Sequence, residues 1–169
     1  MPGALVIQVS SNLVTCCRLL VSGYKFDAAL FFRKCLVMKS YRDLEVYKES
    51  KQLATEVHRL SLILPKFELY EEGSQIRRSS KAVTIAIVEG YGRRRYKADF
   101  IKFLIYSQSE CDETIEHLNF LFETLSLKDI DLYKKLHSEY DILSKKINKF
   151  IQWVEDNWND FPDKQPGNM

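Results

Sequence analysis

Between residues 40 and 158 the apolar residues recur every three or four positions, the spacing of one buried stripe on an α-helix. The first stripe follows Ser40-Tyr-Arg-Asp43, a capping-box pattern with Asp in the acidic position. Pro65 ends it, because proline disfavours the helical conformation in the residue before it. The pattern therefore predicts a first helix, whose buried stripe is Val46, Leu53, Val57, Leu60 and Leu64.

A second helix is predicted to begin near residues 70–74 and to close at Gly90. Its last part, residues 82–88, is rich in β-branched residues and taken alone also fits a strand. No other segment alternates with a period of two, so a lone strand would leave its backbone groups unpaired. We therefore expect a central, well-buried helix whose end is capped by Gly90 and Gly92 in the left-handed conformation. Tyr91 between them is expected to fold back on the protein.

Two longer stripes predict a third and a fourth helix. The third opens near Tyr96 and alternates spacings of four and three, which is the heptad seam of helical bundles. Ser126-Leu-Lys-Asp129 is an N-cap signal for the fourth helix. The third stripe is Phe100, Leu104, Ser107, Cys111, Thr114, Leu118, Leu121 and Leu125, and the fourth is Leu132, Leu136, Tyr140, Leu143, Ile147, Phe150, Val154 and Trp158.

Four long helices with short connections predict an all-α fold, an antiparallel up-down-up-down four-helix bundle over residues 38–158. Residues 159–169 are expected to form a flexible tail. Residues 1–37 show no lasting period, and Met38 stands just before the first patterned helix. We therefore interpret residues 1–37 as an extension outside the fold or as a wrongly assigned start. Polar residues interrupt any membrane span of about 20 apolar residues there.

Composition narrows the classes of function. The formal net charge is +2; residues 1–37 carry a net +3, and the rest holds 21 basic and 22 acidic residues. Whole-chain charge therefore gives no case for a nucleic-acid-binding protein, and any such case depends on a local patch. The four cysteines, Cys16, Cys17, Cys35 and Cys111, lack C-x-x-C spacing, and a reduced, cytoplasmic setting is expected.

A basic corner between the second and third helices is the clearest local feature. It consists of Arg93, Arg94, Arg95, Lys97 and Lys102. Arginine presents a planar fork to phosphate oxygens, so the corner is a candidate nucleic-acid site. The competing interpretation is a solvated turn with no ligand. In an up-down-up-down bundle Lys39 and Arg42 share this end, together with the acidic Asp156, Asp160 and Asp163.

Other polar groups give weaker signals. Glu89 stands at a helix C-terminus, where the helix dipole disfavours an anion, so a partner cation is expected beside it. We assign Glu89, Gly90, Tyr91 and Gly92 a structural or subunit-interface role. Glu110, Glu113, Glu116 and His117 do not fit the Glu-x-x-His pattern of di-iron bundles, because Glu113 and His117 are spaced by four, and no second copy exists. We therefore expect no metal site. The sequence contains no P-loop, nucleophile elbow or catalytic triad, so we predict a non-enzymatic protein without a cofactor.

Several segments together resemble a known family. They are Tyr41-Arg-Asp-Leu-Glu-Val-Tyr, Gln75-Ile-Arg-Arg78, Val88-Glu-Gly-Tyr-Gly-Arg93, Phe100-Ile-Lys-Phe-Leu104 and the segment from Ser109 to Leu118. They are similar to the small bacterial four-helix-bundle proteins encoded in 23S rRNA intervening sequences. A related branch is the accessory variability protein of diversity-generating retroelements. This chain has Ala86 where the family usually has Asn and Thr84 where Pro is common.

The resemblance implies a non-enzymatic homo-oligomer, typically a pentamer, and its retroelement branch implies RNA or DNA and a reverse transcriptase as candidate partners. Two hypotheses follow for this chain. One is a homo-oligomeric scaffold that binds nucleic acid without sequence specificity through its basic corner. The other is a protein-binding adaptor with no nucleic-acid contact.

Overall fold

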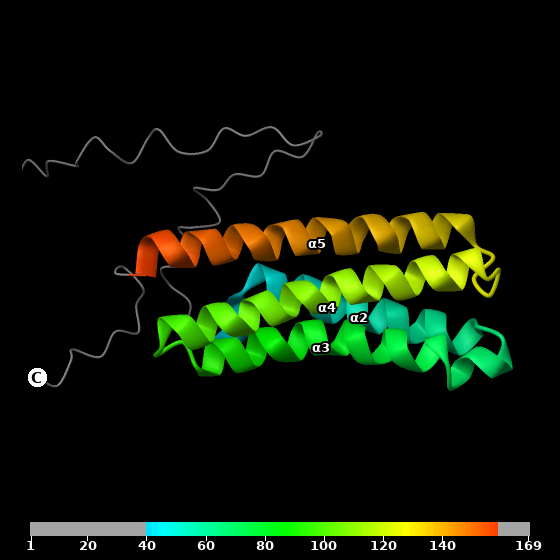
Figure 1. The fold of residues 1–169 in the computed structure, drawn as a ribbon, viewed down its shortest axis with the longest axis horizontal. Coiled ribbons are helices and arrows are strands. Elements are labelled where there is room, and N and C mark those ends of the chain that lie inside the picture. The colour runs from blue at the N-terminus through cyan, green and yellow to red at the C-terminus, as the bar shows by residue number, and fades with distance from the viewer. Residues whose placement is uncertain (1–39, 159–169) are drawn as a thin grey trace, which may run out of the picture. The chain divides into compact units, whose positions relative to one another are not determined.

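The computed structural model describes residues 40–158, and these form four α-helices joined by short connections (Figure 1). No strand occurs among them, and none of the four helices contains an apolar stretch that could span a lipid bilayer. The predicted extension 1–37 and tail 159–169 lie outside the described residues. The helices are α2 (Glu45–Ile63), α3 (Glu72–Gly92), α4 (Lys97–Glu123) and α5 (Ile130–Asn157), with the short 3₁₀ helices η1 (Tyr41–Asp43) and η2 (Lys66–Leu69).

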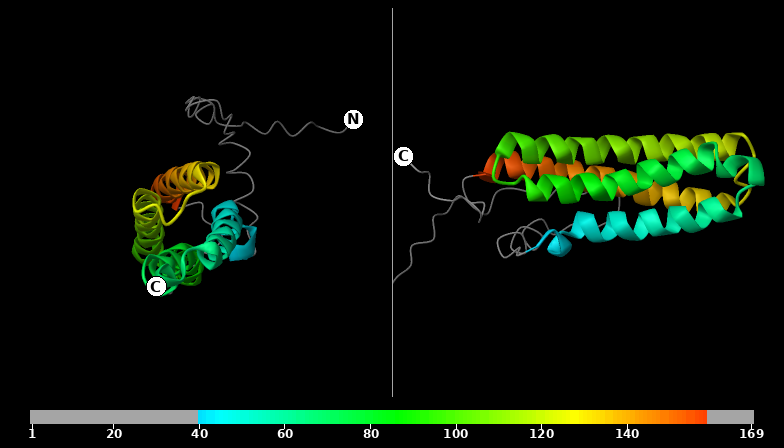
Figure 2. Two further views of the ribbon diagram at one scale, coloured as in Figure 1. Left: turned by 90° about the vertical axis from the view of Figure 1, so that its right-hand side faces the viewer. Right: turned by 90° about the horizontal axis from the view of Figure 1, so that it is seen from below.

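Consecutive helices are connected at alternate ends, so neighbours run antiparallel (Figure 2). The contacts are densest between α3 and α4 and between α4 and α5, and sparser between α2 and α5. The predicted all-α four-helix fold is confirmed. In this topology η1, the α3–α4 corner and the end of α5 share one end of the bundle. The α2–α3 and α4–α5 connections share the other, which we call the far end.

The predicted stripe of α4 is its buried face. All seven of its positions from Phe100 to Leu121 are fully buried, including the thiol of Cys111, whose pKa burial raises. Leu125, the eighth, does not belong to the stripe. It is 71% exposed and has φ 60°, because α4 ends at Glu123 and Leu125 takes the left-handed position of the following turn. The heptad pattern thus predicted the helix well and overran it by one position.

Hydroxyl groups fix α4 against α3 in the middle of the core. The Ser107 hydroxyl donates to the Val83 carbonyl oxygen over 3.0 Å. The Thr114 hydroxyl lies 2.9 Å from Ser79 Oγ. All of these polar groups are buried. Buried polar groups are stable only when paired, so these contacts define which turn of α4 faces which turn of α3.

The helix starts follow local signals with two differences from expectation. The capping box at Ser40 forms, with Ser40 N donating to Asp43 Oδ2 over 3.0 Å, but it caps η1, and α2 begins only at Glu45. Asp129 caps α5 by accepting from the next backbone N–H groups. The Ser126 hydroxyl instead donates to Glu68 Oε1 over 2.6 Å and ties the two far-end connections together.

Candidate nucleic-acid interface

The glycines at the end of α3 do not form the left-handed cap that the sequence suggested. α3 continues through Gly92, and Arg93 closes it with φ −98° and ψ 7°. Gly90 serves the contact between helices instead. A Cβ atom there would lie 3.0 Å from Phe103 Cβ and 3.3 Å from Phe100 Cδ2. Gly92 faces open space. The close approach of α4 therefore explains Gly90, and the buried Tyr91 folds back as expected.

Two of the five predicted basic residues hold the corner in shape. Arg94 Nη1 donates to the Tyr91 carbonyl oxygen over 2.8 Å, and its guanidinium lies 4.0 Å from the centroid of the Tyr91 ring. Lys97 Nζ donates to the Glu155 carbonyl oxygen over 2.7 Å, in the last turn of α5. Terminal carbonyl groups of a helix lack intrahelical partners, so Lys97 caps α5 from the neighbouring helix. Both side chains are half-buried.

The other three basic residues are exposed. The Arg93 guanidinium lies 5.0 Å from the Phe103 ring centroid, and Lys102 Nζ lies 5.7 Å from the Tyr106 ring centroid. Arg95 extends the same corner toward solvent. We call Arg93, Arg95 and Lys102 the exposed cation cluster. Stacking on a ring leaves the N–H edges of a guanidinium free to donate to phosphate oxygens.

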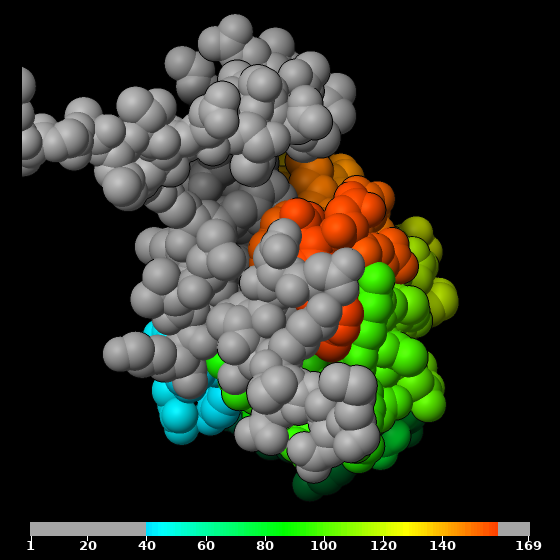
Figure 3. All heavy atoms as spheres, turned by 90° about the vertical axis from the view of Figure 1, so that its left-hand side faces the viewer, coloured from blue at the N-terminus to red at the C-terminus, as the bar shows by residue number. Residues whose placement is uncertain are grey.

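Further charges share this end. Figure 3 views it directly, and the green atoms of the corner adjoin the red-orange atoms of α5. Arg42 is exposed and stacks on Tyr41 at 4.6 Å, while the Tyr41 and Tyr91 rings meet at 6.3 Å. Arg42 therefore joins this end, as the topology predicted. Lys39, Asp160 and Asp163 lie outside the described residues.

Glu89 is exposed one turn before Arg93. No ion pair in residues 40–158 involves it, so the expected partner cation is absent there. Exposure to water explains why none is required, since a solvated carboxylate loses little by standing near a helix C-terminus. Its charge lowers the positive potential of the corner.

In the group formed by Glu110, Glu113, Glu116 and His117 on α4, it is His117 that contacts another helix. His117 Nδ1 lies 2.7 Å from Glu72 Oε2 at the start of α3, and His117 Nε2 lies 3.5 Å from Glu113 Oε1. Burial raises the pKa of Glu110, and the nearby Glu113 adds to this effect. Glu116 accepts from Asn119 Nδ2. Within the described part of the chain, no three His, Cys, Asp or Glu residues are placed to hold a metal ion.

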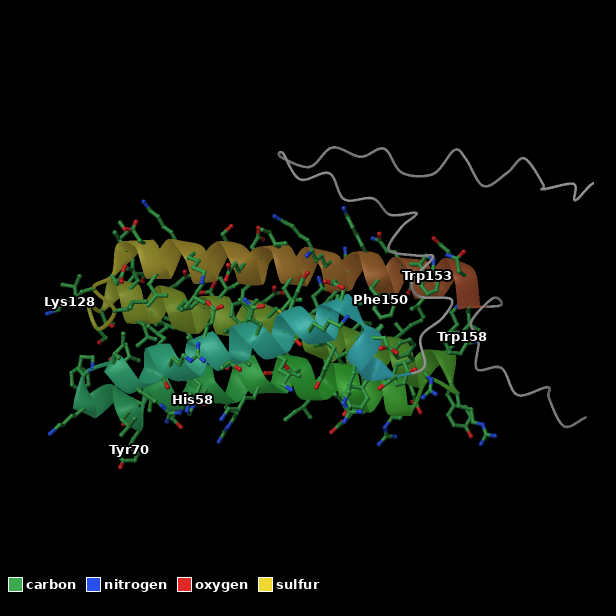
Figure 4. The ribbon with its side chains drawn as sticks, turned by 180° about the vertical axis from the view of Figure 1, so that it is seen from behind. His58, Tyr70, Lys128, Phe150, Trp153 and Trp158 are labelled. Atoms are coloured by element: carbon green, nitrogen blue, oxygen red, sulfur yellow. The ribbon has the colours of Figure 1, made fainter. Side chains whose placement is uncertain are left out.

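The far end carries a feature that sequence reasoning missed. Around the buried pair of Glu68 and Ser126, large apolar side chains are exposed, namely Leu62, Ile63, Phe67, Tyr70, Leu125 and Ile130. We call these six the apolar end. Figure 4 shows Tyr70 and Lys128 at this end and Trp153 and Trp158 at the opposite one. A signal existed in the sequence, because Leu62 and Ile63 fall off the buried stripe and Phe67 and Tyr70 lie in a connection.

The profile of the 23S rRNA-intervening sequence protein family matches residues 42–149. The chain belongs to this family. A solved structure with the same fold is a protein of unknown function of the S23 ribosomal protein family from Bacteroides thetaiotaomicron VPI-5482. It is 23% identical, the TM-score is 0.58, and the match covers 63% of this chain and 95% of that one. No curated protein matches the sequence. The resemblance to this family is thereby confirmed, and at this identity the solved structure shows the fold alone.

Proposed function

We propose that this protein is a non-enzymatic, homo-oligomeric scaffold of the cytoplasm that binds RNA or DNA through the exposed cation cluster. The observation that carries the proposal is that only two of the five basic residues at the corner hold its shape. Arg94 and Lys97 are engaged with backbone carbonyl groups, while Arg93, Arg95 and Lys102 present their charges to solvent. A solvated turn that binds no ligand would need only Arg94 and Lys97 to hold its shape. A reverse transcriptase stays a candidate partner.

Repetition of the corner in an oligomer would strengthen a weak site. The described bundle has no large excess of positive charge, and Glu89 and Asp156 share the corner's end. A cyclic assembly with its axis along the bundle would place one cluster per subunit around the same face. Positive potentials from neighbouring clusters then add, and phosphate contacts release condensed counterions. Such binding depends on salt and is largely indifferent to base sequence.

The first prediction concerns charge. Full-length protein with Arg93→Glu, Arg95→Glu and Lys102→Glu should lose binding to RNA and DNA, because its phosphate contacts are reversed. A matched control makes the same charge change at the far end, with Lys66→Glu, Lys128→Glu and Lys134→Glu, all exposed. Binding is measured by fluorescence anisotropy between about 50 and 200 mM salt. Three cations predict a slope of log K against log salt of about −2 to −3 for each engaged subunit.

Circular dichroism and light scattering must show that both triple variants keep the helicity and the mass of the unaltered protein. The control should retain most of its affinity. Equal loss in the two variants, equal binding by all three proteins, or no binding by the unaltered protein at low salt would remove the proposal. A slope of about −3.5 to −4.5 for each engaged subunit would instead mean that Arg94 and Lys97 also contact phosphate.

A second candidate function is a protein-binding adaptor, and the apolar end favours it. Six large apolar side chains are exposed at this one end, and a concentration of exposed apolar side chains is typical of protein-binding sites. Replacing Leu62, Phe67 and Tyr70 with Ser should then reduce recovery of a partner protein while leaving nucleic-acid binding unchanged. The reversed cluster should have the opposite effects, so the pair of variants separates the two functions.

A further inference from the structure

The exposed cation cluster is accompanied by aromatic rings that the core does not use. Tyr96, which precedes the first residue of α4, is 62% exposed, and Tyr106 is 47% exposed. The Tyr96 backbone N–H donates to the Arg93 carbonyl oxygen over 2.9 Å, and its side chain is exposed to solvent. Aromatic side chains of this size generally bury much of their surface. Two rings beside three cations therefore point to a ligand with both negative charge and flat apolar faces.

Contacts join two of the cations, Arg93 and Lys102, to the rings of Phe103 and Tyr106. The Arg93 guanidinium lies over the Phe103 ring, Phe103 meets Tyr106 edge-to-face with centroids 5.8 Å apart, and Lys102 Nζ approaches Tyr106. Phe103 is half-buried and fixed by the approach of α3 at Gly90, where the added Cβ would meet it. The surface therefore rests on the rigid part of the bundle. Side chains that are held in place lose less entropy when a ligand binds.

We propose that the corner and the first turns of α4 form a stacking surface for single-stranded nucleic acid, with bases on Tyr96 and Tyr106 and phosphates on Arg93, Arg95 and Lys102. This inference rests on the proposed function and names its ligand more closely. Bases in a duplex already stack on one another and cannot reach a protein ring. Unpaired bases can, and base–aromatic stacking tolerates any base because every base has a flat π-face.

Acidic residues limit the length of this surface. From Tyr96 to Tyr106 the helix rises by about 15 Å, which accommodates only a few nucleotides. One turn beyond Tyr106 stand Glu110 and then Glu113, whose carboxylates repel phosphates. Asp99, in the first turn of α4, is half-buried. A single subunit therefore offers a short track, and a longer strand must pass from one subunit to another.

The test compares rings with charges in the full-length protein. One variant removes both rings, with Tyr96→Ala and Tyr106→Ala, and a second keeps them, with Tyr96→Phe and Tyr106→Phe. Tyr70→Ala, at the far end and 81% exposed, controls for loss of an unrelated tyrosine. The ligands are labelled oligo(dT) and oligo(U) of about 20 nucleotides and a DNA duplex of the same length, at about 50 mM salt.

The unaltered protein should bind both single strands more tightly than the duplex. The alanine variant should lose about fivefold in affinity for each ring, about 25-fold in all, for single strands, and less than about twofold for the duplex. The phenylalanine variant and Tyr70→Ala should bind as the unaltered protein does. If the affinities for oligo(dT) and oligo(U) fall by similar factors, the protein recognises the bases and phosphates that both strands contain. A loss of affinity for only one of the two strands would contradict stacking that is independent of the sugar type and the base identity.

Further results would overturn the inference as well. They are equal binding of single strands and duplex by the unaltered protein, an equal loss for both in the alanine variant, and a fall in particle mass when the rings are removed. The last result would assign the two rings to a contact with a second copy of the chain. If charge reversal abolishes binding and ring removal does not, only the stacking surface fails. If charge reversal has no effect, the proposed function itself fails.

Discussion

At the level of single residues, the two glycines that end α3 have different surroundings. A side-chain carbon at Gly90 would press on Phe100 and Phe103 at 3.0–3.4 Å, a distance that few real Cβ contacts show. A side-chain carbon at Gly92 would meet nothing within 4 Å. Both residues lie in helical backbone, where alanine is intrinsically favoured over glycine by up to about 1 kcal/mol. Packing therefore decides whether alanine stabilises or destabilises the fold at Gly90, and helix propensity decides it at Gly92.

We predict that Gly92→Ala leaves the free energy of unfolding unchanged or slightly raises it. Gly90→Ala should lower it relative to Gly92→Ala by about 1–3 kcal/mol, the usual cost of overpacking a tight core contact. Urea denaturation followed by circular dichroism measures both variants. Equal stability of the two would mean that α4 moves aside easily, and the account of Gly90 as a close-approach residue would be wrong.

Single residues are also where sequence reasoning was weakest. The sequence places Arg93, Arg94 and Arg95 in one basic corner, yet in the structure Arg94 differs from Arg93 and Arg95 because it is held by the Tyr91 carbonyl oxygen. Arg94 turns back onto Tyr91 because it follows the end of α3, where carbonyl groups lack helical partners. The amino-acid sequence alone does not indicate which of the three arginines faces those carbonyl groups. The left-handed Leu125 was equally hidden, because leucine rarely adopts that conformation.

At the level of helices, the edge between α2 and α5 differs from the other three. Its contacts are sparser, and two ion pairs cross it. Lys135 Nζ lies 2.7 Å from Glu56 Oε2, and Lys146 Nζ lies 2.5 Å from Glu49 Oε1. The hydrogen bond from Lys135 holds the pKa of Glu56 below its usual value, and partial burial acts in the opposite direction. Charge thus supplements apolar packing along this edge.

The lowered pKa of Glu56 gives a prediction about pH. Because the folded state favours the ionised carboxylate, the pair stabilises the fold above the unfolded pKa, near 4.5, and this contribution disappears as the pH falls through the lower folded value. Glu56→Gln should therefore make stability less sensitive to pH between 6 and about 3. Urea midpoints at several pH values measure the effect. Lys135→Met should flatten the curve similarly, and unchanged curves would show that the pair does not couple to folding.

Helices themselves were predictable because their signals repeat. Each buried stripe spans several turns, so an error at one position shifts the predicted end of a helix but does not change the prediction that a helix is present. The seven buried positions of α4 match the predicted seam, whereas its end and the cap of α5 shifted by a few residues. The buried pair of Ser126 and Glu68 was missed, because it joins two connections 58 positions apart and no local pattern marks it.

At the level of the whole molecule, exposed apolar groups suggest assembly. Besides the apolar end, Ile85 on α3 and Ile105 on α4 are 55% and 50% exposed, each about two turns from the α3–α4 corner. Burial of such side chains is the main favourable contribution to association. We expect subunits to pack through the two isoleucines, with the exposed cation cluster at the border of the contact, because Lys102 lies only one turn before Ile105.

We predict a particle well above the monomer mass of 19.9 kDa in light scattering at micromolar concentration. Ile85→Lys together with Ile105→Lys should lower that mass, since two buried charges without partners would disfavour the interface. The paired control is Leu62→Lys with Ile63→Lys at the far end, which should leave the mass unchanged. A monomeric unaltered protein would refute the prediction, and a fall in mass only in the control would move the interface to the apolar end.

The hydroxyl contacts between α3 and α4 have a consequence for the uniqueness of the fold. A heptad seam looks much the same after a shift of seven residues, so apolar packing alone tolerates a bundle whose helices have slipped by two turns. The contacts of Ser107 with Val83 and of Thr114 with Ser79 form between the helices in only one alignment. A slip would break both and leave Thr114 only its bond to the Glu110 carbonyl oxygen within α4. The leucines and phenylalanines thus make the bundle stable, and a few small hydroxyls decide which of several similar bundles it is.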